Sequence, residues 1–214
     1  MKPDISHIHW LGHDGFRIES NGLQIYIDPY QLKGSPPAAD LILITHDHFD
    51  HCSPEDIDKI HKDETIFVTI AAAAAKLRGE IEVVKPGDKI TVKGIPIEAV
   101  PAYNLTKFRS PGNPFHPKDA GYVGFILTLG DQRIYHTGDA DVIPEMQTFD
   151  VDIALLPVSG TYVMTAEEAV EAEKILQPKV VIPMHVGCGI GDLDMCEEFK
   201  QKASVPVEIL ELEG

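Results

Sequence analysis

An apolar run that ends in a cluster of ionisable side chains constrains the fold of this chain more than any other feature. Residues 40–45, DLILIT, are nearly continuous in apolar character, which predicts a strand covered on both faces. The next six residues, HDHFDH at 46–51, contain three histidines and two aspartates. Because buried ionisable groups are costly unless they are paired or bind a cation, this junction predicts a metal site at the end of a buried strand.

Two later apolar segments end in the same way. RIYHTG at 133–138 runs into Asp139, and VVIPM at 180–184 runs into His185. A side chain at a strand end sits on a rigid scaffold but can still be reached by a substrate. We therefore expect the three strand ends to contribute to one site.

The spacing within the first cluster suits a metal ion with an open coordination position. His46 and His48 are two residues apart, so both point to the same side of an extended chain. Two histidines and a third ligand make a catalytic zinc-type site that leaves room for water. The remaining ionisable residues of these strand ends suffice for a second ion, with a carboxylate that could bridge ions about 3.5–4 Å apart: Asp50, His51 and His185, and Asp139 as the bridge.

Strands and helices are mixed along the whole chain, which predicts one α/β domain over residues 1–214. Asn21-Gly22 and Gly130-Asp131 predict two hairpin turns. Strands are expected at 6–12, 16–20, 23–28, 40–45, 65–69, 81–84, 89–92, 95–103, 121–139 (a hairpin), 151–160, 179–185 and 205–213. Helices are expected at 53–61, 70–79, 165–178 and 192–203.

Capping residues and turn residues mark the boundaries of several elements. Ser53 and Pro54 suit the start of the first helix. Thr165 and Glu168 have the spacing of a capping box at the start of the third. Residues 104–120, NLTKFRSPGNPFHPKDA, are rich in Pro, Gly and Asn and lack periodicity, so we expect a long functional loop.

Composition limits the partners of the protein. With 34 Asp and Glu against 18 Lys and Arg the formal net charge is −16, which disfavours a nucleic-acid substrate. Three scattered cysteines make neither a disulfide framework nor a cysteine zinc site. No signal peptide or membrane span is recognisable. The expected protein is cytoplasmic, acts on a small molecule, and has no membrane or nucleic-acid partner.

These motifs resemble those of the metallo-β-lactamase superfamily. HDHFDH at 46–51 matches its HxHxDH signature, and TGD at 137–139 and the histidine of VIPMH at 181–185 follow in the family's order. WLGHDGFRI at 10–18 and LPVSGTYVMTAEEA at 156–169 extend the similarity to the branch that includes ascorbate-6-phosphate lactonase-like proteins. The resemblance implies a four-layer αββα sandwich with a binuclear site along one edge.

Carried over residue by residue, the resemblance implies a full set of metal ligands. His46 and His48 would hold the first ion, while Asp50, His51 and His185 would hold the second and Asp139 would bridge them. The family usually supplies a third histidine to the first ion after the strand that ends near residue 103, where this chain has Asn104. Either His116 from the following loop replaces it, which we favour, or Asn104 binds weakly, or the first site is depleted.

Three further residues are candidates for substrate binding or for support of the ligands. His13 in LGHDG matches a position that approaches the site in this branch, and Tyr162 in SGTYVMT could face the cleft. Asp28, ahead of Pro29, could orient a histidine from the outer coordination shell. His136 is an outer-shell or a structural residue.

The predicted function is metal-assisted hydrolysis. Two divalent ions, Zn²⁺ first and Mn²⁺ or Fe²⁺ as alternatives, would bridge a water and lower its pKa toward about 7. Asp50 would orient that nucleophile and accept its proton, and Asp50 and His116 are the candidate catalytic residues. The substrate expected is a small ester, lactone or phosphodiester, whose anionic group Lys107, Arg109 and Lys118 could bind if they are not merely solvated. The alternative is a non-hydrolytic metal protein, an iron redox site or a metal-dependent sensor, with an incomplete first site.

Overall fold

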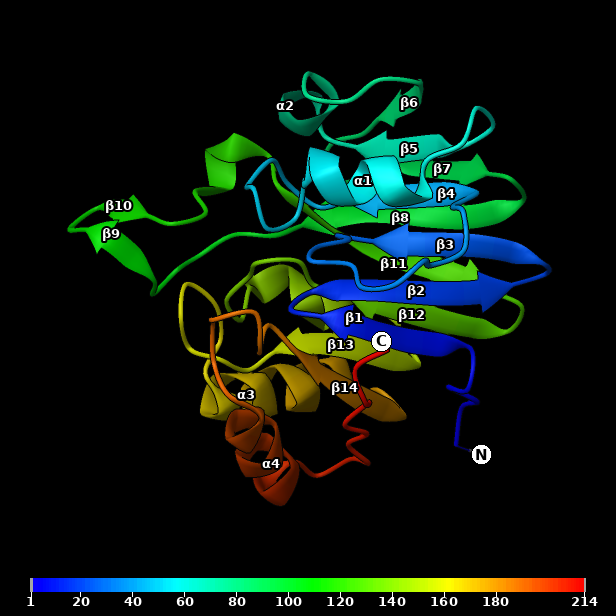
Figure 1. Cartoon of the computed structure of the whole chain (residues 1–214). Coiled ribbons are helices and arrows are strands. Elements are labelled where there is room, and N and C mark those ends of the chain that lie inside the picture. Colours follow the sequence, from blue (N-terminus) through cyan, green and yellow to red (C-terminus); the bar gives the residue numbers. More distant parts are fainter. Residues whose placement is uncertain (1, 214) are drawn as a thin grey trace.

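Two six-stranded sheets face each other in the computed structural model, which describes residues 2–213 (Figure 1). The first sheet is built in chain order from β1 (Ile8–Gly12), β2 (Gly15–Ser20), β3 (Leu23–Ile27), β4 (Leu41–Ile44), β5 (Ile66–Thr69) and β6 (Glu80–Val83). The second has the order β14 (Val180–Met184), β13 (Ile153–Pro157), β12 (Gln132–His136), β11 (Val123–Leu129), β8 (Ile95–Pro101) and β7 (Lys89–Val92).

Helices cover the outer faces of both sheets. Helix α1 (Pro54–Ile60) lies over the first sheet and α2 (Ala71–Ala74) contacts β6 beside it (Figure 1). Helix α3 (Ala166–Leu176) contacts β13, and α4 (Leu193–Lys202) contacts both α3 and β14. The αββα sandwich that the sequence predicts is therefore confirmed. Within residues 2–213, no helix is long and apolar enough to cross a membrane.

The strands that arise from continuous apolar runs are parallel to their neighbours and buried on both faces, as those runs predict. All four residues of β4 are buried, and β4 pairs in parallel with β3 and β5. Strands β13 and β14 are fully buried and parallel in the second sheet. Within each sheet, parallel strands have their carboxyl ends at the same edge. His46 follows β4 at that edge of the first sheet, and His185 follows β14 at that edge of the second.

The local signals for turns and caps are also confirmed. Asn21 and Gly22 both have positive φ and join β2 to β3, with Ser20 paired with Leu23. Leu129 pairs with Gln132 across the second predicted turn. Ser53 caps α1, and both hydrogen bonds of the capping box are present at the start of α3.

Two predicted elements are wrong in extent. The helix expected at 70–79 is only Ala71–Ala74, because the chain must turn back within a few residues to place β6 parallel to β5. The strand expected at 205–213 does not form. This segment makes one bridge to each sheet, Val207 with Val181 and Leu212 with Trp10. It passes from the edge of the second sheet to the edge of the first, so neither ladder can continue along it.

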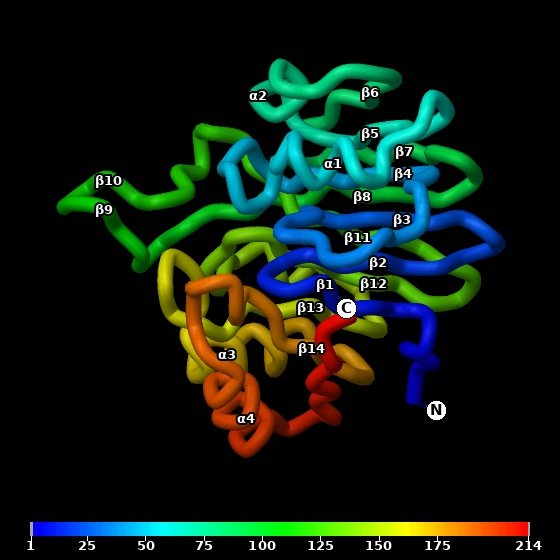
Figure 2. The backbone as a smooth tube through the Cα atoms, in the orientation of Figure 1, coloured from blue at the N-terminus to red at the C-terminus, as the bar shows by residue number. Residues whose placement is uncertain are grey.

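The long loop at 104–120 contains short elements that its composition does not reveal. A small hairpin of β9 (Phe108–Ser110) and β10 (Asn113–Pro114) projects from the sheets, as Figure 2 shows at the left. A 3₁₀ turn, η1 (Lys118–Ala120), then leads into β11. A second 3₁₀ turn, η2 (Pro144–Thr148), follows the Asp139 loop and was not predicted.

Candidate metal site

The carboxylate of Asp139 is the point at which the predicted ligands meet. Its Oδ2 atom lies 3.2 Å from His116 Nε2 and 4.0 Å from His46 Nε2. Its Oδ1 atom lies 3.3 Å from His51 Nε2 and 3.6 Å from His185 Nε2. The two oxygens therefore face two different groups of histidines, as a bridging carboxylate would.

The group on the Oδ2 side is made by three histidines. His46, His48 and His116 each offer a ligand atom, and these atoms lie within 4.8 Å of one another. His46 Nε2 lies 3.0 Å from His48 Nδ1. The structure thus brings His116 from the long loop to the place where the sequence left either His116 or Asn104 as the third ligand.

Asn104 lies behind His116 and holds it in place. Its Oδ1 atom accepts hydrogen bonds from the backbone N–H of His116 at 2.9 Å and from the ring Nδ1 at 2.8 Å. Its amide nitrogen donates to Asp141 Oδ1 and to the carbonyl oxygen of Tyr162, both at 3.0 Å. With every polar atom of the Asn104 amide engaged in this way, Asn104 is a positioning residue for His116.

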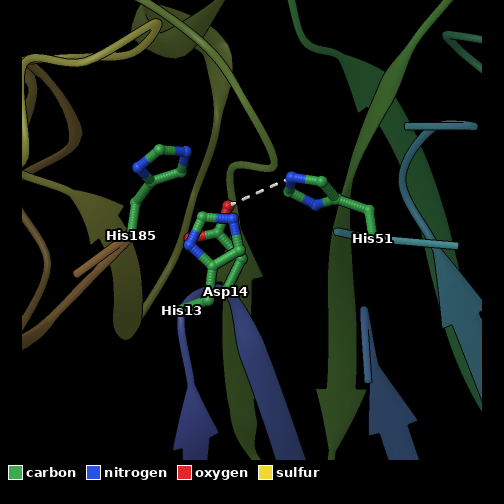
Figure 3. A group of neighbouring side chains, drawn as sticks. All are labelled: His13, Asp14, His51 and His185. Carbon is green, nitrogen blue, oxygen red and sulfur yellow. Dashed lines mark ion pairs between the residues drawn. The ribbon is translucent and has the colours of Figure 1, made fainter. Parts of the chain in front are cut away.

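The group on the Oδ1 side contains a residue that the sequence analysis did not single out. Ligand atoms of His13, Asp14, His51 and His185 lie within 4.8 Å of one another (Figure 3). His13 had been expected only as a substrate or outer-shell residue. Asp14 follows it in LGHDG, and a carboxyl group beside a histidine at a glycine turn is the signal that could have found it.

Four histidines have one ring nitrogen bound from behind and the other directed to the site. The bound nitrogen is Nδ1 in each case, so Nε2 is left for a cation, which is the usual arrangement of metal-binding histidines. The partners are Thr45 Oγ1 for His46 (3.0 Å), Asp28 Oδ2 for His51 (2.8 Å), Asn104 Oδ1 for His116 (2.8 Å) and Ser159 Oγ for His185 (2.8 Å). Asp28 thus takes the outer-shell position that the sequence suggested for it.

Unpaired buried atoms at the centre of the cluster fit a divalent cation. Within residues 2–213, hydrogen-bond partners are lacking for both oxygens of Asp14, Oδ1 of Asp139, and Nε2 of His51, His116 and His185. Buried polar atoms are nearly always paired, because an unpaired one costs about 1–3 kcal/mol. These nitrogen and oxygen atoms converge, so a bound cation would satisfy them together.

The charges of the cluster are strongly coupled. Burial alone would raise the pKa of Asp139, but His51, His185 and His116 hold it well below its ordinary value. Burial alone would lower the pKa of His51, but Asp139 and Asp28 raise it well above the usual range. In the absence of a metal ion, Asp139 and Asp28 therefore favour the protonated, positively charged form of His51.

Asp50 lies beside His13, which belongs to the Oδ1 group. Its Oδ2 atom lies 3.3 Å from His13 Nε2. Burial would raise the pKa of Asp50, but the neighbouring His13 and His51 lower it to about 2. Asp50 is therefore a carboxylate at neutral pH, and its ligand role, which the sequence predicted, stays a prediction.

The site opens into a cavity of about 310 Å³. His48, Asp50, His116 and Asp139 lie at its base, and its walls are formed by Phe49, Arg109, Phe115 and Tyr162. Tyr162, in the loop before α3, lines the cavity, as the sequence suggested. Its backbone φ is positive, and the residue is 41% exposed. His136 is buried, and both of its ring nitrogens are hydrogen-bonded to backbone.

Comparison with known proteins places the chain in a family. The description Beta-lactamase superfamily domain matches residues 7–185, a span that contains every residue of the cluster. The chain belongs to the beta-lactamase superfamily. The narrower resemblance to ascorbate-6-phosphate lactonase-like proteins stays a prediction.

Similar proteins share this chain's length as well as its fold. A metal-dependent hydrolase of Pyrococcus abyssi is 34% identical, over 96% of this chain and 99% of its own. One from Methanopyrus kandleri is 30% identical over 96% of both chains. A crystal structure from Parabacteroides distasonis, described as a metal-dependent hydrolase, is 34% identical with a TM-score of 0.82, covering 96% of this chain and 93% of that one. The family and the His/Asp cluster together imply binding of a divalent metal.

Proposed function

We propose that this protein is a binuclear metal-dependent hydrolase that cleaves a small ester, lactone or phosphodiester. The observation that carries the proposal is the position of Asp139, whose two oxygens face separate groups of histidines beside an open cavity, with Nε2 of His51, His116 and His185 buried and unpaired within residues 2–213. The names of the relatives above support metal-dependent hydrolysis. The substrate class is inferred from the net charge of −16 and from the basic residues of the loop at 104–120.

The proposal assigns five histidines and the Asp139 carboxylate to the two ions. His46, His48 and His116 would hold the first, and His51 and His185 would hold the second, with Asp139 between them. All these ligand atoms are nitrogen or oxygen, a set that suits Zn²⁺ and also Mn²⁺ or Fe²⁺. Such ions, when bound, would lower the pKa of water toward about 7 and offset charge on the reacting oxygen.

In this proposal, Asp50 would accept the proton of the attacking water. It lines the cavity, and the pKa of about 2 that its neighbours produce keeps it ionised at neutral pH. His13 Nε2 lies 3.3 Å from its carboxylate. A general base must be unprotonated and within reach of the water. Asp50 meets the first condition because His13 and His51 lower its pKa.

The loop at 104–120 favours a substrate with an anionic group. Lys107 is held by Glu168 at 2.6 Å, and Lys118 is held by Glu145 at 2.8 Å. Arg109 lies over the Phe115 ring at 4.9 Å and lines the cavity, and no ion pair of Arg109 occurs in the part of the chain that the structure describes. A guanidinium without a carboxylate partner, above metal ligands, suits a phosphate or carboxylate of a small molecule.

The alternative, a non-hydrolytic metal protein, depended on an incomplete first site. His116 lies beside His46 and His48, so the absence of a histidine at residue 104 does not by itself deplete that site. Metal analysis still separates the two functions. Near two equivalents of a divalent ion favour the hydrolase, and one equivalent or less favours the alternative.

Turnover of simple chromogenic substrates tests the proposal. The untagged protein, purified without chelator, is assayed with 4-nitrophenyl esters and bis(4-nitrophenyl) phosphate. We expect hydrolysis that chelator abolishes and that Asp139→Asn reduces at least about a hundredfold, because the bridge between the two groups is weakened. The matched control is Asp131→Asn in the exposed turn between β11 and β12, which should retain full activity. A metal-loaded protein that is inactive on both substrate classes would overturn the proposal.

A further inference from the structure

Asp14 is a fully buried carboxylate without a partner. Its side chain is 0% exposed, and neither carboxylate oxygen has a hydrogen-bond partner among residues 2–213. Two other buried aspartates are fully engaged: Asp28 binds Thr45 and His51, and Asp56 binds backbone N–H groups, Ser53 and Lys59. Since buried charges are normally paired or bind metals, Asp14 requires a ligand of its own.

The turn that carries Asp14 is held so that the side chain cannot swing out to water. The carbonyl oxygen of Asp14 accepts a hydrogen bond from His136 Nε2 at 2.9 Å, and Nδ1 of the same ring accepts from Gly138 N–H at 3.1 Å. A Cβ atom at Gly15 would lie only 3.0 Å from the carbonyl oxygen of Gly12, so the backbone beside Asp14 is too closely packed for a side chain. His136 thus ties the Asp14 turn to the loop that carries Asp139.

The carboxylate of Asp14 faces the same point as three imidazoles. Figure 3 shows it between His185 and His51, and its Oδ2 atom lies 3.9 Å from His51 Nε2. That separation is too long for a hydrogen bond but fits two ligands that share one ion. A cation is the partner that would pair the carboxylate and the imidazole nitrogens at once.

We propose that Asp14 is a ligand of the second metal ion, together with His13, His51, His185 and Asp139. Asp50, the carboxylate that the sequence predicted as a ligand of this ion, lies beside His13 and lines the cavity. Asp14 would supply a second, fully buried carboxylate to the same ion, whether or not Asp50 also binds it. This inference rests on the metal-binding part of the proposed function and is independent of the substrate.

Stability with and without metal separates a ligand from a structural residue. Asp14→Asn keeps the shape of the side chain and removes its charge. In protein stripped by chelator, the variant should melt at the wild-type temperature or above it, because an unpaired buried carboxylate has been removed. On addition of Mn²⁺ or Zn²⁺, the rise in melting temperature should be smaller than in wild type. The affinity for the second equivalent, measured by calorimetry, should fall at least about tenfold.

A matched control is Asp56→Asn, a buried aspartate whose partners are all protein groups. It should lower the melting temperature equally with and without metal and leave the metal affinity unchanged. Asp14→Ala gives a second variant, and the visible absorption of bound Co²⁺ gives a second readout. Loss of a ligand should increase the band intensity, because lower-coordinate Co²⁺ absorbs more strongly.

The outcomes distinguish this inference from the proposed function. Wild-type affinity, stoichiometry and Co²⁺ spectrum in both Asp14 variants would overturn the ligand assignment alone. Variants destabilised equally with and without metal would also overturn it and show a structural role. A wild-type protein that binds no divalent ion would overturn the proposed function as well.

Discussion

Single hydrogen bonds behind the histidines decide which nitrogen each ring offers to the site. Asn104 shows this most clearly, because its side-chain oxygen binds both the backbone and the ring of His116. Asn104 itself is held by Asp141 and by the carbonyl oxygen of Tyr162. The sequence left open whether Asn104 is a weak metal ligand or marks a depleted site. In the structure Asn104 instead supports His116, which takes the position of the third ligand.

Asn104→Ala should weaken the first metal site. Removing the acceptor for His116 Nδ1 frees the ring to rotate and to change tautomer, so we expect the affinity for the first ion to fall about 10–100-fold. Calorimetric titration of the stripped protein measures this. Asn104→Asp retains the acceptor and should lose less affinity than Asn104→Ala. Equal affinities in wild type and Asn104→Ala would show that His116 does not need this support.

The pKa of His51 makes metal binding depend on pH. Asp139 and Asp28 raise this pKa well above its ordinary value in spite of burial. In metal-free protein, the resulting stabilisation is fully present below the unfolded-state pKa and is lost as pH rises through the folded-state value. A bound ion displaces the proton and competes better at higher pH.

The gain in melting temperature on metal binding should therefore increase between about pH 6 and about pH 8. Calorimetric titrations in buffers of different ionisation enthalpy should show proton release. A gain that is constant across this range, without proton release, would contradict a proton held on His51.

At the scale of elements, the hairpin of β9 and β10 forms one wall of the cavity without belonging to either large sheet. It sits between Asn104 and His116, so the same loop provides a candidate ligand, its support and the Arg109 side chain. Loops between rigid elements are where proteins vary their specificity. The loop is therefore the element expected to select the substrate.

Arg109→Gln should raise KM for an anionic substrate. With the mono-4-nitrophenyl ester of glutaric acid we expect a rise of about tenfold, the value of one charge-assisted hydrogen bond. The neutral 4-nitrophenyl butyrate should be unaffected. Lys118→Gln is the matched control, since Lys118 is already paired with Glu145. Equal effects of Arg109→Gln on both esters would argue against recognition of an anion.

For the whole molecule, the site joins the two sheets. β1 and β4 of the first sheet lead to His13 and His46, and β12 and β14 of the second lead to Asp139 and His185. A bound cation would cross-link the halves of the sandwich and neutralise part of an acidic chain of net charge −16. Metal binding and global stability are therefore expected to be coupled.

Removal of metal should lower the melting temperature of the protein substantially. A ligand present at about 1,000 times its Kd stabilises the folded state by roughly 4 kcal/mol, which corresponds to about 8–16 °C for a chain of this size. Differential scanning calorimetry before and after dialysis against chelator measures the change, and re-addition of Zn²⁺ or Mn²⁺ should reverse it. A chelator-treated protein shown to be free of metal but melting unchanged would contradict this coupling.

The sequence by itself determined the elements whose cause is local. Apolar runs predict the buried parallel strands, Asn21-Gly22 predicts a hairpin, and the Thr165 capping box predicts the start of α3, because each depends on neighbouring residues. The sequence also predicted that His46, Asp139 and His185, each at the end of an apolar strand, would contribute to one site.

Only the tertiary structure decided what depends on residues far apart in the chain. The segment at 205–213 has a strand-like composition but crosses between the sheets, and no local pattern encodes its path. His116 reaches the first group only through the folding of its loop, and Asn104 supports it across twelve residues of sequence. Asp14 is fully buried, and neither of its carboxylate oxygens has a hydrogen-bond partner among residues 2–213. Burial and pairing are properties of the packed molecule, and for that reason a side chain adjacent to His13 in sequence acquires its chemistry only in the fold.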